Sequence, residues 1–314
     1  MSFIKGKKVM VTGGAGFLGS HVVELLKKKD CKDIIIPRSK LVDLRNQEAC
    51  FKYIGKNKPD IVIHLAASVG GIGANKKNPA TFLYDNLSMG LHLYEASRIY
   101  NVEKLITCGT ICSYPKYTKV PFKEDDIWEG YPEETNAPYG LAKKILLVQG
   151  QSYRQQYGFN SIYLLPVNLY GPGDNFDLES SHVIPALIRK CLEAKENKQD
   201  SITVWGTGEV TREFLYVKDA AEAIVRAAEI YNGAEPINIG TGEEIFIKDL
   251  VSLIAEKTNF TSEIIWDKTK PDGQPRRCLD ITRAKNILGF EAKTSLSDGL
   301  DMTIEWYRSN IKGG

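Results

Sequence analysis

The sequence predicts an α/β protein built on a doubly wound parallel sheet, followed by a smaller α/β domain. Three observations support this prediction. Short apolar runs alternate with longer helical patterns through the first half of the chain. These runs are almost continuous in Val, Ile and Leu, as in parallel strands that are buried on both faces. A glycine-rich turn joins the first apolar run to the first helical segment, as in doubly wound folds.

Each element of the first half follows from the spacing of its apolar residues. In the first helical segment these residues recur at 17, 18, 22, 23, 25 and 26, which places them on one helical face. Pro37 ends the second apolar run. We expect strands over 8–14, 33–37, 60–67, 104–110 and 160–167. We expect helices over 17–29, 46–57, 79–101 and 138–157.

The alternation becomes less regular after about residue 170. A polar loop, GPGDNFDLESSH, precedes a helix expected over 183–195, and 201–217 predicts a strand, a turn and a second strand. Further helices are expected over 218–231, 247–257 and 299–308. The pattern predicts a first domain over 1–170, to which about 213–240 return, and a second domain covering mainly 171–314.

Composition argues against several classes of protein. The 41 basic and 39 acidic residues are mixed along the chain, so neither nucleic acid nor an acidic membrane surface is an expected partner. Six cysteines are scattered without a CxxC pair, as in a reducing compartment, and no metal site is predicted. The chain shows no signal segment and no apolar run of about 18 residues. We expect a cytoplasmic protein with no membrane partner.

The turn VTGGAGFLGSH predicts a phosphate-binding site. Gly13, Gly16 and Gly19 follow the pattern GxxGxxG directly after the first strand, and Phe17 and Leu18 open the first helix. Glycines let the backbone approach a pyrophosphate, which rests on the helix N-terminus. This context predicts a Rossmann dinucleotide-binding domain. The alternative is a glycine turn that only packs the helix against the strand.

The end of the second strand indicates which dinucleotide is bound. An acidic residue there favours NAD, because it binds the ribose hydroxyls. This chain has PRSK instead, and Arg38 and Ser39 could hold a 2′-phosphate. We therefore expect NADP(H) as the preferred cofactor, with NAD(H) possible. Alternatively, Arg38 and Lys40 are surface charges above the adenine. Asp43 is expected to cap the adenine region rather than to bind the ribose.

The segment APYGLAKK predicts a catalytic pair. Tyr139 and Lys143 are four residues apart, so on a helix they share a face. A nearby ammonium, together with a positive nicotinamide ring, is expected to lower the pKa of the phenol and to make Tyr139 a usable acid. The motif CGTICSYP precedes this pair, and Thr110 there offers a hydroxyl to a sugar carbonyl. The alternative is a packed tyrosine, a solvated lysine and an ordinary strand threonine.

These residues carry a resemblance to a known family. The chain resembles the extended short-chain dehydrogenase/reductases that modify nucleotide sugars, the NAD-dependent epimerase/dehydratase family. Within this family it is most similar to the GDP-4-keto-6-deoxymannose 3,5-epimerase/4-reductases. The similarity covers nearly the whole chain. Its motifs occur in the family's order: HLAASVGGIGANKKNPATFLYDN, GTICSYPK, YGLAK, NLYGPGDNF, SHVIPALIRK, VWGTGEVTREFLYV and PDGQPRR.

The resemblance implies catalytic roles. Tyr139 would protonate the C4 oxygen as hydride arrives, supported by Lys143, and Thr110 stands where the family usually has serine. Cys112 and His182 would be the base and acid that move protons at C3 and C5. Since Cys112 lies two residues after Thr110, both side chains are expected to face the same side of the fourth strand. The alternative for His182 is a loop histidine that caps a helix.

The resemblance also implies binding residues. The nucleotide sugar would contact Lys190, Arg212 and Arg277, with Trp205 beside it and Asp272 at the nucleotide ribose or base. Val69 and Gly70 are further expected substrate contacts. The residues expected along the cofactor, besides those of the glycine turn and PRSK, are Leu44, Leu65, Ala66, Ala67, Asn86, Lys143, Pro166, Asn168, Leu169 and His182. His64 and His92 lie in strand and helix patterns and are expected to be structural.

The resemblance implies NADPH-dependent conversion of a GDP-4-keto-6-deoxy sugar, by a homodimer that would pair through the helices at about 79–101 and 138–157. The loop GGAGFLG is the form common in epimerases and dehydratases. It leaves open an epimerase that acts on a UDP- or GDP-sugar with tightly bound NAD and no net redox change. A 4,6-dehydratase is disfavoured because Ile111 and Cys112, not acidic residues, follow Thr110. A non-catalytic NADP-binding protein is the remaining alternative.

Overall fold

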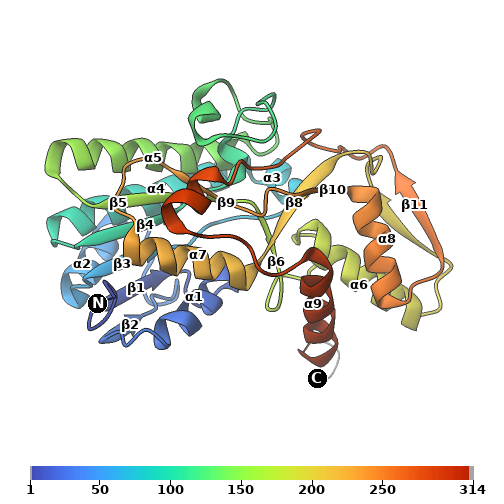
Figure 1. The fold of residues 1–314 in the computed structure, drawn as a ribbon, viewed down its shortest axis with the longest axis horizontal. Helices are drawn as coiled ribbons and strands as arrows, with labels where there is room; N and C mark the ends of the chain where they lie inside the picture. The colour runs from blue at the N-terminus through green and yellow to red at the C-terminus, as the bar shows by residue number, and fades with distance from the viewer. Residues whose placement is uncertain (1, 311–314) are drawn as a thin grey trace.

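A parallel sheet forms the centre of the larger lobe in the computed structural model, which describes residues 2–310 (Figure 1). Within these residues the sheet has six strands in the order β2-β1-β3-β4-β5-β9. Their bounds are β1 Lys8–Thr12, β2 Asp33–Ile35, β3 Ile61–His64, β4 Lys104–Cys108, β5 Ser161–Pro166 and β9 Ile237–Ile239. The first five confirm the predicted strands, whereas β9 was not predicted. The order of the strands reverses at β1, because β2 lies on one side of it and β3 and the later strands lie on the other. Folds of this kind bind ligands at that point, between β1 and β3.

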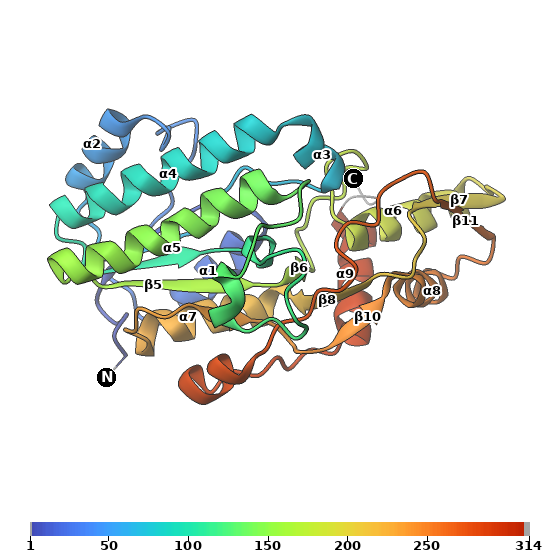
Figure 2. The same ribbon diagram turned by 90° about the horizontal axis from the view of Figure 1, so that it is seen from above.

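Helices cover both faces of this sheet (Figures 1 and 2). One face carries α2 (Gln47–Asn57), α4 (Pro79–Ile99) and α5 (Ala137–Tyr157), and the other carries α1 (Phe17–Lys27) and α7 (Val217–Ile230). All five confirm the predicted helices. Local signals fix their ends, because proline opens α4 and α5 and a left-handed glycine follows α5.

The smaller lobe contains two further sheets. The first has the order β10-β8-β6, and β7 pairs with β11 in the second. The two strands predicted within 201–217 form, but β7 and β8 belong to different sheets. The strand bounds are β6 Asn168–Tyr170, β7 Ser201–Trp205, β8 Thr211–Tyr216, β10 Glu244–Phe246 and β11 Glu263–Asp267. The helix bounds are α6 Val183–Glu196, α8 Ile247–Thr258 and α9 Leu296–Asn310.

Several short elements were not predicted, because each depends on contacts distant in sequence. Besides β6, β10 and β11, they include α3 (Ile72–Lys77), the 3₁₀ segments Ile111–Ser113 and Glu124–Trp128, and a π-helical turn at Ala284–Leu288. One expected strand also ends early. The fourth strand, predicted over 104–110, stops at Cys108, and the chain then turns into the first 3₁₀ segment.

Two clusters of buried apolar side chains lie in the two lobes. The first draws on residues between 4 and 167, and adds members from 215–239 and 279–290. The second draws on residues between 170 and 260 and on α9. The division into domains at residue 170 stays a prediction. Apolar residues within 279–290 also pack in the core of the first lobe, which was not predicted. Between residues 2 and 310 no helix has the length and apolar character needed to cross a membrane.

Candidate active site

A cleft of about 1010 Å³ extends from the carboxyl ends of β1, β3, β4 and β5 to the smaller lobe. This volume lies at the upper end of the usual range for small-molecule sites. All the residues predicted for catalysis, cofactor and substrate line the cleft, with the exception of Asn86. The fold therefore brings together residues that lie far apart in the sequence, from Gly13 to Arg277.

The glycine turn forms a cradle that only glycine fits. Gly13 has a φ of +71°, and a Cβ placed there would lie 2.8 Å from the backbone nitrogen of Ala66. A Cβ on Gly19 would overlap the carbonyl oxygen of Gly13. Gly16 precedes α1 and offers no side-chain cap to the first N–H groups of the helix. These groups are open to an anion, so the turn fits a dinucleotide pyrophosphate.

The expected adenine end of the cleft carries an arginine that the sequence reasoning missed. Arg45 donates hydrogen bonds to Asp43 at 2.9 Å and to Asp85 at 3.1 Å. The side-chain hydrogen bond from Arg45 lowers the pKa of Asp43. Asp43 is therefore an ionised, paired carboxylate, whereas Arg38 and Ser39 are exposed at the cleft edge. The motif VDLR contains Arg45, but nothing in it shows that the arginine joins two carboxylates.

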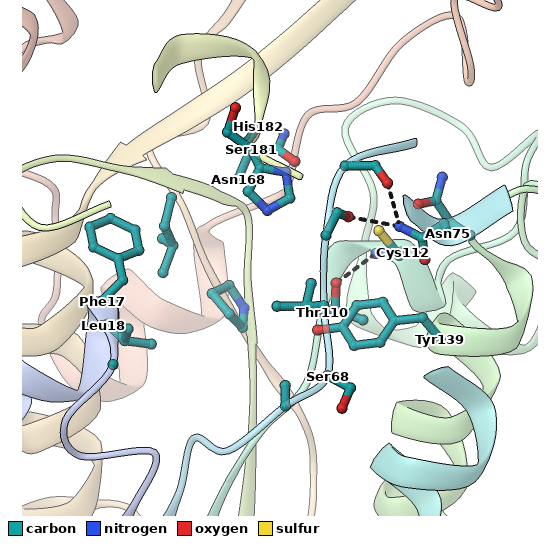
Figure 3. A pocket seen from close by; sticks show the side chains of 18 of the residues that line it. Phe17, Leu18, Ser68, Asn75, Thr110, Cys112, Tyr139, Asn168, Ser181 and His182 are labelled. Atoms are coloured by element: carbon teal, nitrogen blue, oxygen red, sulfur yellow. Dashed lines mark hydrogen bonds between the residues drawn. The ribbon is translucent and has the colours of Figure 1, made fainter. Parts of the chain in front are cut away.

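Tyr139 and Lys143 share one face of α5, as predicted, and both are buried. Gly140 lies between them in sequence and permits a close approach, because a Cβ there would overlap the carbonyl oxygen of Cys112. The hydroxyl of Ser113 also donates to the carbonyl of Gly140 at 2.9 Å. The helix and the 3₁₀ turn thus form one corner of the cleft, in which the hydroxyls of Tyr139 and Thr110 lie close together (Figure 3).

The predicted lowering of the Tyr139 pKa includes the positive charge of a nicotinamide ring, and the protein groups by themselves act in the opposite direction. Burial raises the pKa of the phenol, and the nearby thiols of Cys112 and Cys108 raise it further. The hydrogen bond with Thr110 acts in the opposite direction but is the smaller effect. Burial also lowers the pKa of Lys143. Tyr139 is therefore a protonated group at neutral pH, which suits a proton donor.

Cys112 reaches the cleft by a different route from the one predicted. It does not lie on a strand, so strand alternation does not explain its direction. Thr110 precedes the 3₁₀ turn, and its Oγ1 accepts a hydrogen bond from the backbone N–H of Cys112 at 3.2 Å. This contact fixes the turn, and the side chains of both residues line the cleft. Thr110 and Cys112 therefore line the same cleft because of the 3₁₀ turn, and not because of alternation along a strand.

His182 lies on the opposite wall from Cys112 and Tyr139 (Figure 3). It directly precedes α6, yet its side chain forms no capping hydrogen bond, so the structure does not support the helix-cap alternative. The ring is accessible from the cleft, while the surrounding walls desolvate it and lower its pKa. A mainly neutral imidazole therefore faces the thiol and the phenol across the cleft.

The predicted substrate cations are held by backbone carbonyls of the smaller lobe. Lys190 donates to the carbonyl of Thr203 at 2.8 Å. Arg212 donates to the carbonyls of Thr211 at 2.6 Å and Asp272 at 2.8 Å. Burial is the largest cause that lowers the pKa of Arg212, but a guanidinium remains charged at neutral pH. Both side chains are thus oriented cations on the cleft wall.

Trp205 and Asp272 lie nearby. The indole of Trp205 is half exposed, and the ammonium of Lys270 lies 5.3 Å from its ring centroid. The carboxylate of Asp272 accepts from the backbone N–H of Thr207 at 2.8 Å and from its hydroxyl at 2.9 Å. Asp272 therefore fixes the turn that follows β7 while it lines the cleft.

Asn86 does not border the cleft, and its predicted contact with the cofactor stays a prediction. Its side chain is buried and binds the backbone of Ser68. Asn75, which the sequence reasoning missed, supports the neighbouring substrate segment. Its amide donates to the carbonyls of Gly70 at 2.7 Å and Gly71 at 3.1 Å. No local sequence signal identifies either role, because both depend on where the chain folds back.

Other predicted residues lie as expected. His64 is fully buried with its Nδ1 2.8 Å from the hydroxyl of Thr12, and His92 lies 3.1 Å from the carbonyl of Leu44. Neither histidine borders the cleft, which is consistent with structural roles.

Within residues 2–310 no group of three or more His, Cys, Asp or Glu is arranged to hold a metal ion. The remaining cofactor-side lining comprises Phe17, Leu18, Leu44, Leu65, Ala66, Ala67, Pro166, Asn168 and Leu169, and Val69 and Gly70 complete the substrate side.

Residues 9–240 match the NAD dependent epimerase/dehydratase family. The chain belongs to this family. The predicted family and the Rossmann-type fold are therefore confirmed. The GDP-L-fucose synthase of Sinorhizobium fredii is 43% identical to this chain, over 99% of this chain and 98% of the relative.

Two solved structures share the fold closely. A GDP-6-OMe-4-keto-L-xylo-heptose reductase from C. jejuni has a TM-score of 0.92 and 29% identity, covering 98% of this chain and 99% of the other. A GDP-L-fucose synthetase from Naegleria fowleri bound to NADP has a TM-score of 0.90 and 31% identity, covering 99% and 96%. Both lobes of this chain therefore have the same arrangement as in these two structures.

Proposed function

We propose that this chain is an NADPH-dependent nucleotide-sugar epimerase/reductase that converts a GDP-4-keto-6-deoxy sugar, as GDP-L-fucose synthases do. One observation carries the proposal: Tyr139, Thr110, Cys112 and His182 face a single cleft beside a dinucleotide cradle. A simple reductase needs only the phenol and its neighbours, whereas the thiol and the imidazole add a second pair of proton-transfer groups. The similarity to GDP-L-fucose synthases over nearly the whole chain supports the same function.

The cofactor in this proposal is NADP(H). The glycine cradle fits the pyrophosphate, and the exposed Arg38 and Ser39 at the cleft edge suit a 2′-phosphate. Asp43 would compete for the ribose hydroxyls as in NAD enzymes, but its carboxylate is paired with Arg45. The NADP-bound structure of the Naegleria relative is in line with this preference.

The epimerisation part of the reaction uses proton transfer on carbons beside the ketone. Cys112 removes the proton at C3 or C5, so that the C–H bond breaks, an S–H bond forms and the electron pair moves to the C4 oxygen. His182, on the opposite wall, acts as the acid in its imidazolium form: the ring takes up a proton from solvent, and its N–H bond breaks as a C–H bond forms on the other side of the same carbon. A base and an acid on opposite walls are what inversion at a carbon requires.

The reduction part uses the corner formed by α5 and the 3₁₀ turn. NADPH supplies hydride to C4 when it is bound. Tyr139 donates its proton to the C4 oxygen, and the hydroxyl of Thr110 orients that oxygen. The raised pKa of Tyr139 keeps the phenol protonated until this step. Lys143 lies on the same helix face, where its ammonium stabilises the phenolate that remains and can hold the nicotinamide ribose.

The nucleotide part of the substrate lies against the smaller lobe. Lys190 and Arg212 are oriented by backbone carbonyls and provide positive charge for a diphosphate. The half-exposed indole of Trp205 offers a flat apolar surface beside them. Asp272, which fixes the neighbouring turn, is placed for the ribose or base.

The deciding experiment supplies GDP-4-keto-6-deoxymannose with NADPH or NADH, in deuterated water, and identifies the product by NMR. We expect NADPH oxidation, one deuterium each at C3 and C5, and a preference for NADPH over NADH. Deuterium exchange without consumption of NADPH would favour a redox-neutral epimerase with tightly bound NAD. Binding of NADPH without either reaction would indicate a non-catalytic protein. Screening other 4-keto nucleotide sugars then defines the base and the sugar.

We also propose a homodimer that pairs through α4 and α5, which lie side by side on one face of the molecule (Figure 2). Leu91 and Val148 on these helices are apolar yet 37% and 44% exposed, and the side chain of Gln149 reaches the carbonyl of Leu91. Light scattering should show a dimer for the natural chain and a monomer for the double variant Leu91→Glu/Val148→Glu. Ile230→Glu, an exposed apolar position on the opposite face, is the matched control.

The same proposal places the enzyme in the cytoplasm without nucleic acid or membrane partners. All six cysteines are free, and a reducing compartment keeps thiols in this state. Fractionation of cells that express a tagged chain tests the location. Recovery with membranes or in an oxidising compartment would contradict it.

A further inference from the structure

Arg277 contacts Cys112 on the substrate side of the cleft. Nη1 of Arg277 lies 3.6 Å from Sγ of Cys112, and the arginine is only 7% exposed. A cation close to a sulfur favours the thiolate, which is the reactive form of cysteine. The family resemblance assigned Arg277 to the nucleotide sugar, but its guanidinium points to a catalytic group of this chain.

The orientation of Arg277 is fixed by its neighbours. Its Nε donates to the side-chain oxygen of Gln274 at 2.9 Å. The amide of Gln274, which is also buried, donates to the carbonyls of Pro115 at 3.2 Å and Lys116 at 2.8 Å. The segment that carries Arg277 is thus tied to the chain just after the turn that carries Cys112. This arrangement directs the guanidinium to the sulfur and leaves it little freedom to follow a diphosphate.

A buried carboxylate balances the cations of this region. Burial acts to raise the pKa of Glu133, but hydrogen bonds from Thr135 and Asn136 and the charge of Arg277 outweigh it, so the pKa is lowered. Glu133 is therefore ionised, and it also acts on Arg212. The carboxylate of Asp272 also acts on Arg212, so two carboxylates balance the two guanidinium groups. The direct contact of Arg277 with the sulfur, and not an excess charge of the region, therefore favours the thiolate.

The groups that face Cys112 come from several elements. Arg212 extends from β8, Tyr139 from α5 and Arg277 from the segment before Cys278, while the hydroxyl of Thr110 binds the backbone of Cys112. The thiol and the phenol of Tyr139 are both weak acids, and each ionised group disfavours the ionisation of the other. Arg277 is bonded to the sulfur and therefore favours ionisation at Cys112.

We propose that Arg277 is a positioning residue that holds Cys112 as a thiolate, and so determines that the thiol is the base and the phenol the acid. The catalytic part rests on the proposed function, in which the thiolate takes the proton at C3 or C5. The ion pair itself does not depend on that function. In the proton transfer the C–H bond breaks, the S–H bond forms and the electron pair passes to the C4 oxygen. Arg277 then faces a neutral thiol until the proton leaves.

The experiment measures alkylation of Cys112 by iodoacetamide over a series of pH values, by peptide mass spectrometry on the full chain without substrate. We expect Arg277→Met to slow alkylation at neutral pH by about tenfold or more and to shift the profile upward by about one pH unit or more. Arg276→Met is the matched control, because Arg276 is the adjacent residue but is exposed and pairs with Glu244. Its alkylation profile should equal that of the natural chain.

The outcomes separate this inference from the proposed function. An unchanged alkylation profile in Arg277→Met, with a raised KM for the nucleotide sugar, would overturn the inference and return Arg277 to the diphosphate. If Arg277→Met does not fold, the ultraviolet absorbance of the natural chain minus that of Cys112→Ser decides: a thiolate signal at neutral pH supports the inference, and its absence overturns it. A shifted profile in an enzyme that ignores GDP-4-keto sugars would leave the ion pair in place and refute the proposed function.

Discussion

The side-chain amide of Asn86 binds both backbone polar groups of Ser68. Its Oδ1 accepts from the N–H of Ser68 at 3.1 Å, and its Nδ2 donates to the carbonyl at 2.8 Å. Asn86 lies on α4, behind the segment that follows β3 and lines the cleft. The residue therefore holds the wall of the predicted cofactor site from behind.

Replacing Asn86 should weaken cofactor binding more than it affects the chemical step. Asn86→Ala leaves two partly buried backbone groups of Ser68 without this partner, and the loss of a hydrogen bond by a fully buried group costs about 1–3 kcal/mol. We expect the Kd for NADPH, measured by fluorescence titration, to rise about tenfold or more while saturated turnover changes less. Asn75→Ala, which loosens the substrate segment instead, is the comparison. A loss of turnover with unaltered NADPH binding would show that Asn86 acts on the chemistry.

Arg38 should select NADP over NAD. Charge-assisted hydrogen bonds contribute about 1.5–3 kcal/mol, so Arg38→Ala should weaken NADPH binding roughly 10- to 100-fold and leave NADH binding nearly unchanged. Lys40→Ala is the control, because Lys40 is an exposed cation two residues away that does not line the cleft. Equal weakening of both cofactors in Arg38→Ala would show that another group reads the 2′-phosphate.

Tyr139→Phe should remove the proton donor and retain the shape of the site. General acid catalysis contributes about 10²–10⁴-fold, so we expect a fall in the rate of NADPH oxidation within that range. Deuterium exchange at C3 and C5, which depends on Cys112 and His182 in the proposed mechanism, should continue. Tyr131→Phe, at an exposed tyrosine, serves as the control. Normal NADPH oxidation in Tyr139→Phe would exclude the phenol as the acid.

Gly140 should tolerate no side chain. A Cβ there would overlap the carbonyl oxygen of Cys112, which belongs to the backbone and cannot move aside easily. We expect Gly140→Ala to lower the free energy of unfolding by about 1–3 kcal/mol and to reduce activity at least tenfold, because the turn shifts away from α5. Gln156→Ala, at an exposed polar position near the end of the same helix, should be close to neutral in both assays. Unchanged stability and activity in Gly140→Ala would contradict the close packing.

Asp174 should make stability fall as pH rises from about 4 to about 7. Burial raises the pKa of Asp174 to about 7, and its Oδ2 forms no hydrogen bond within the described residues. Because the folded state binds a proton that the unfolded state releases in this range, rising pH favours unfolding. Raising the pKa from about 4 to about 7 corresponds to at most about 4 kcal/mol.

Asp174→Asn removes this ionisation and keeps an oxygen that can accept from the N–H of Asn175. Thermal unfolding should show the variant more stable than the natural chain by several degrees above pH 7, with the difference shrinking toward pH 4. Asp177→Asn, at an exposed carboxylate of the same loop, should lack this increase with pH, because its pKa is lowered. A difference for Asp174→Asn that does not grow with pH would show that the carboxyl is not buried in its protonated form.

The sequence alone determined the features that depend on local pattern. Apolar spacing predicted the first five strands of the sheet and the helices on its faces, since burial on both faces leaves a continuous apolar run. The glycine spacing predicted the phosphate cradle, because a turn with a φ of +71° at Gly13 excludes other residues. The helical spacing of Tyr139 and Lys143 predicted their shared face.

Only the tertiary structure decided the features that depend on what packs against each group. It ended the fourth strand at Cys108, moved Asn86 behind the cleft wall and joined Arg277 to Cys112. It also set the direction of the Tyr139 pKa in the protein by itself, which is raised because the cost of burying a phenolate exceeds the favourable contacts that the chain supplies. Residue spacing specifies which side chains share a face, whereas desolvation and long-range hydrogen bonds arise only when distant segments enclose them.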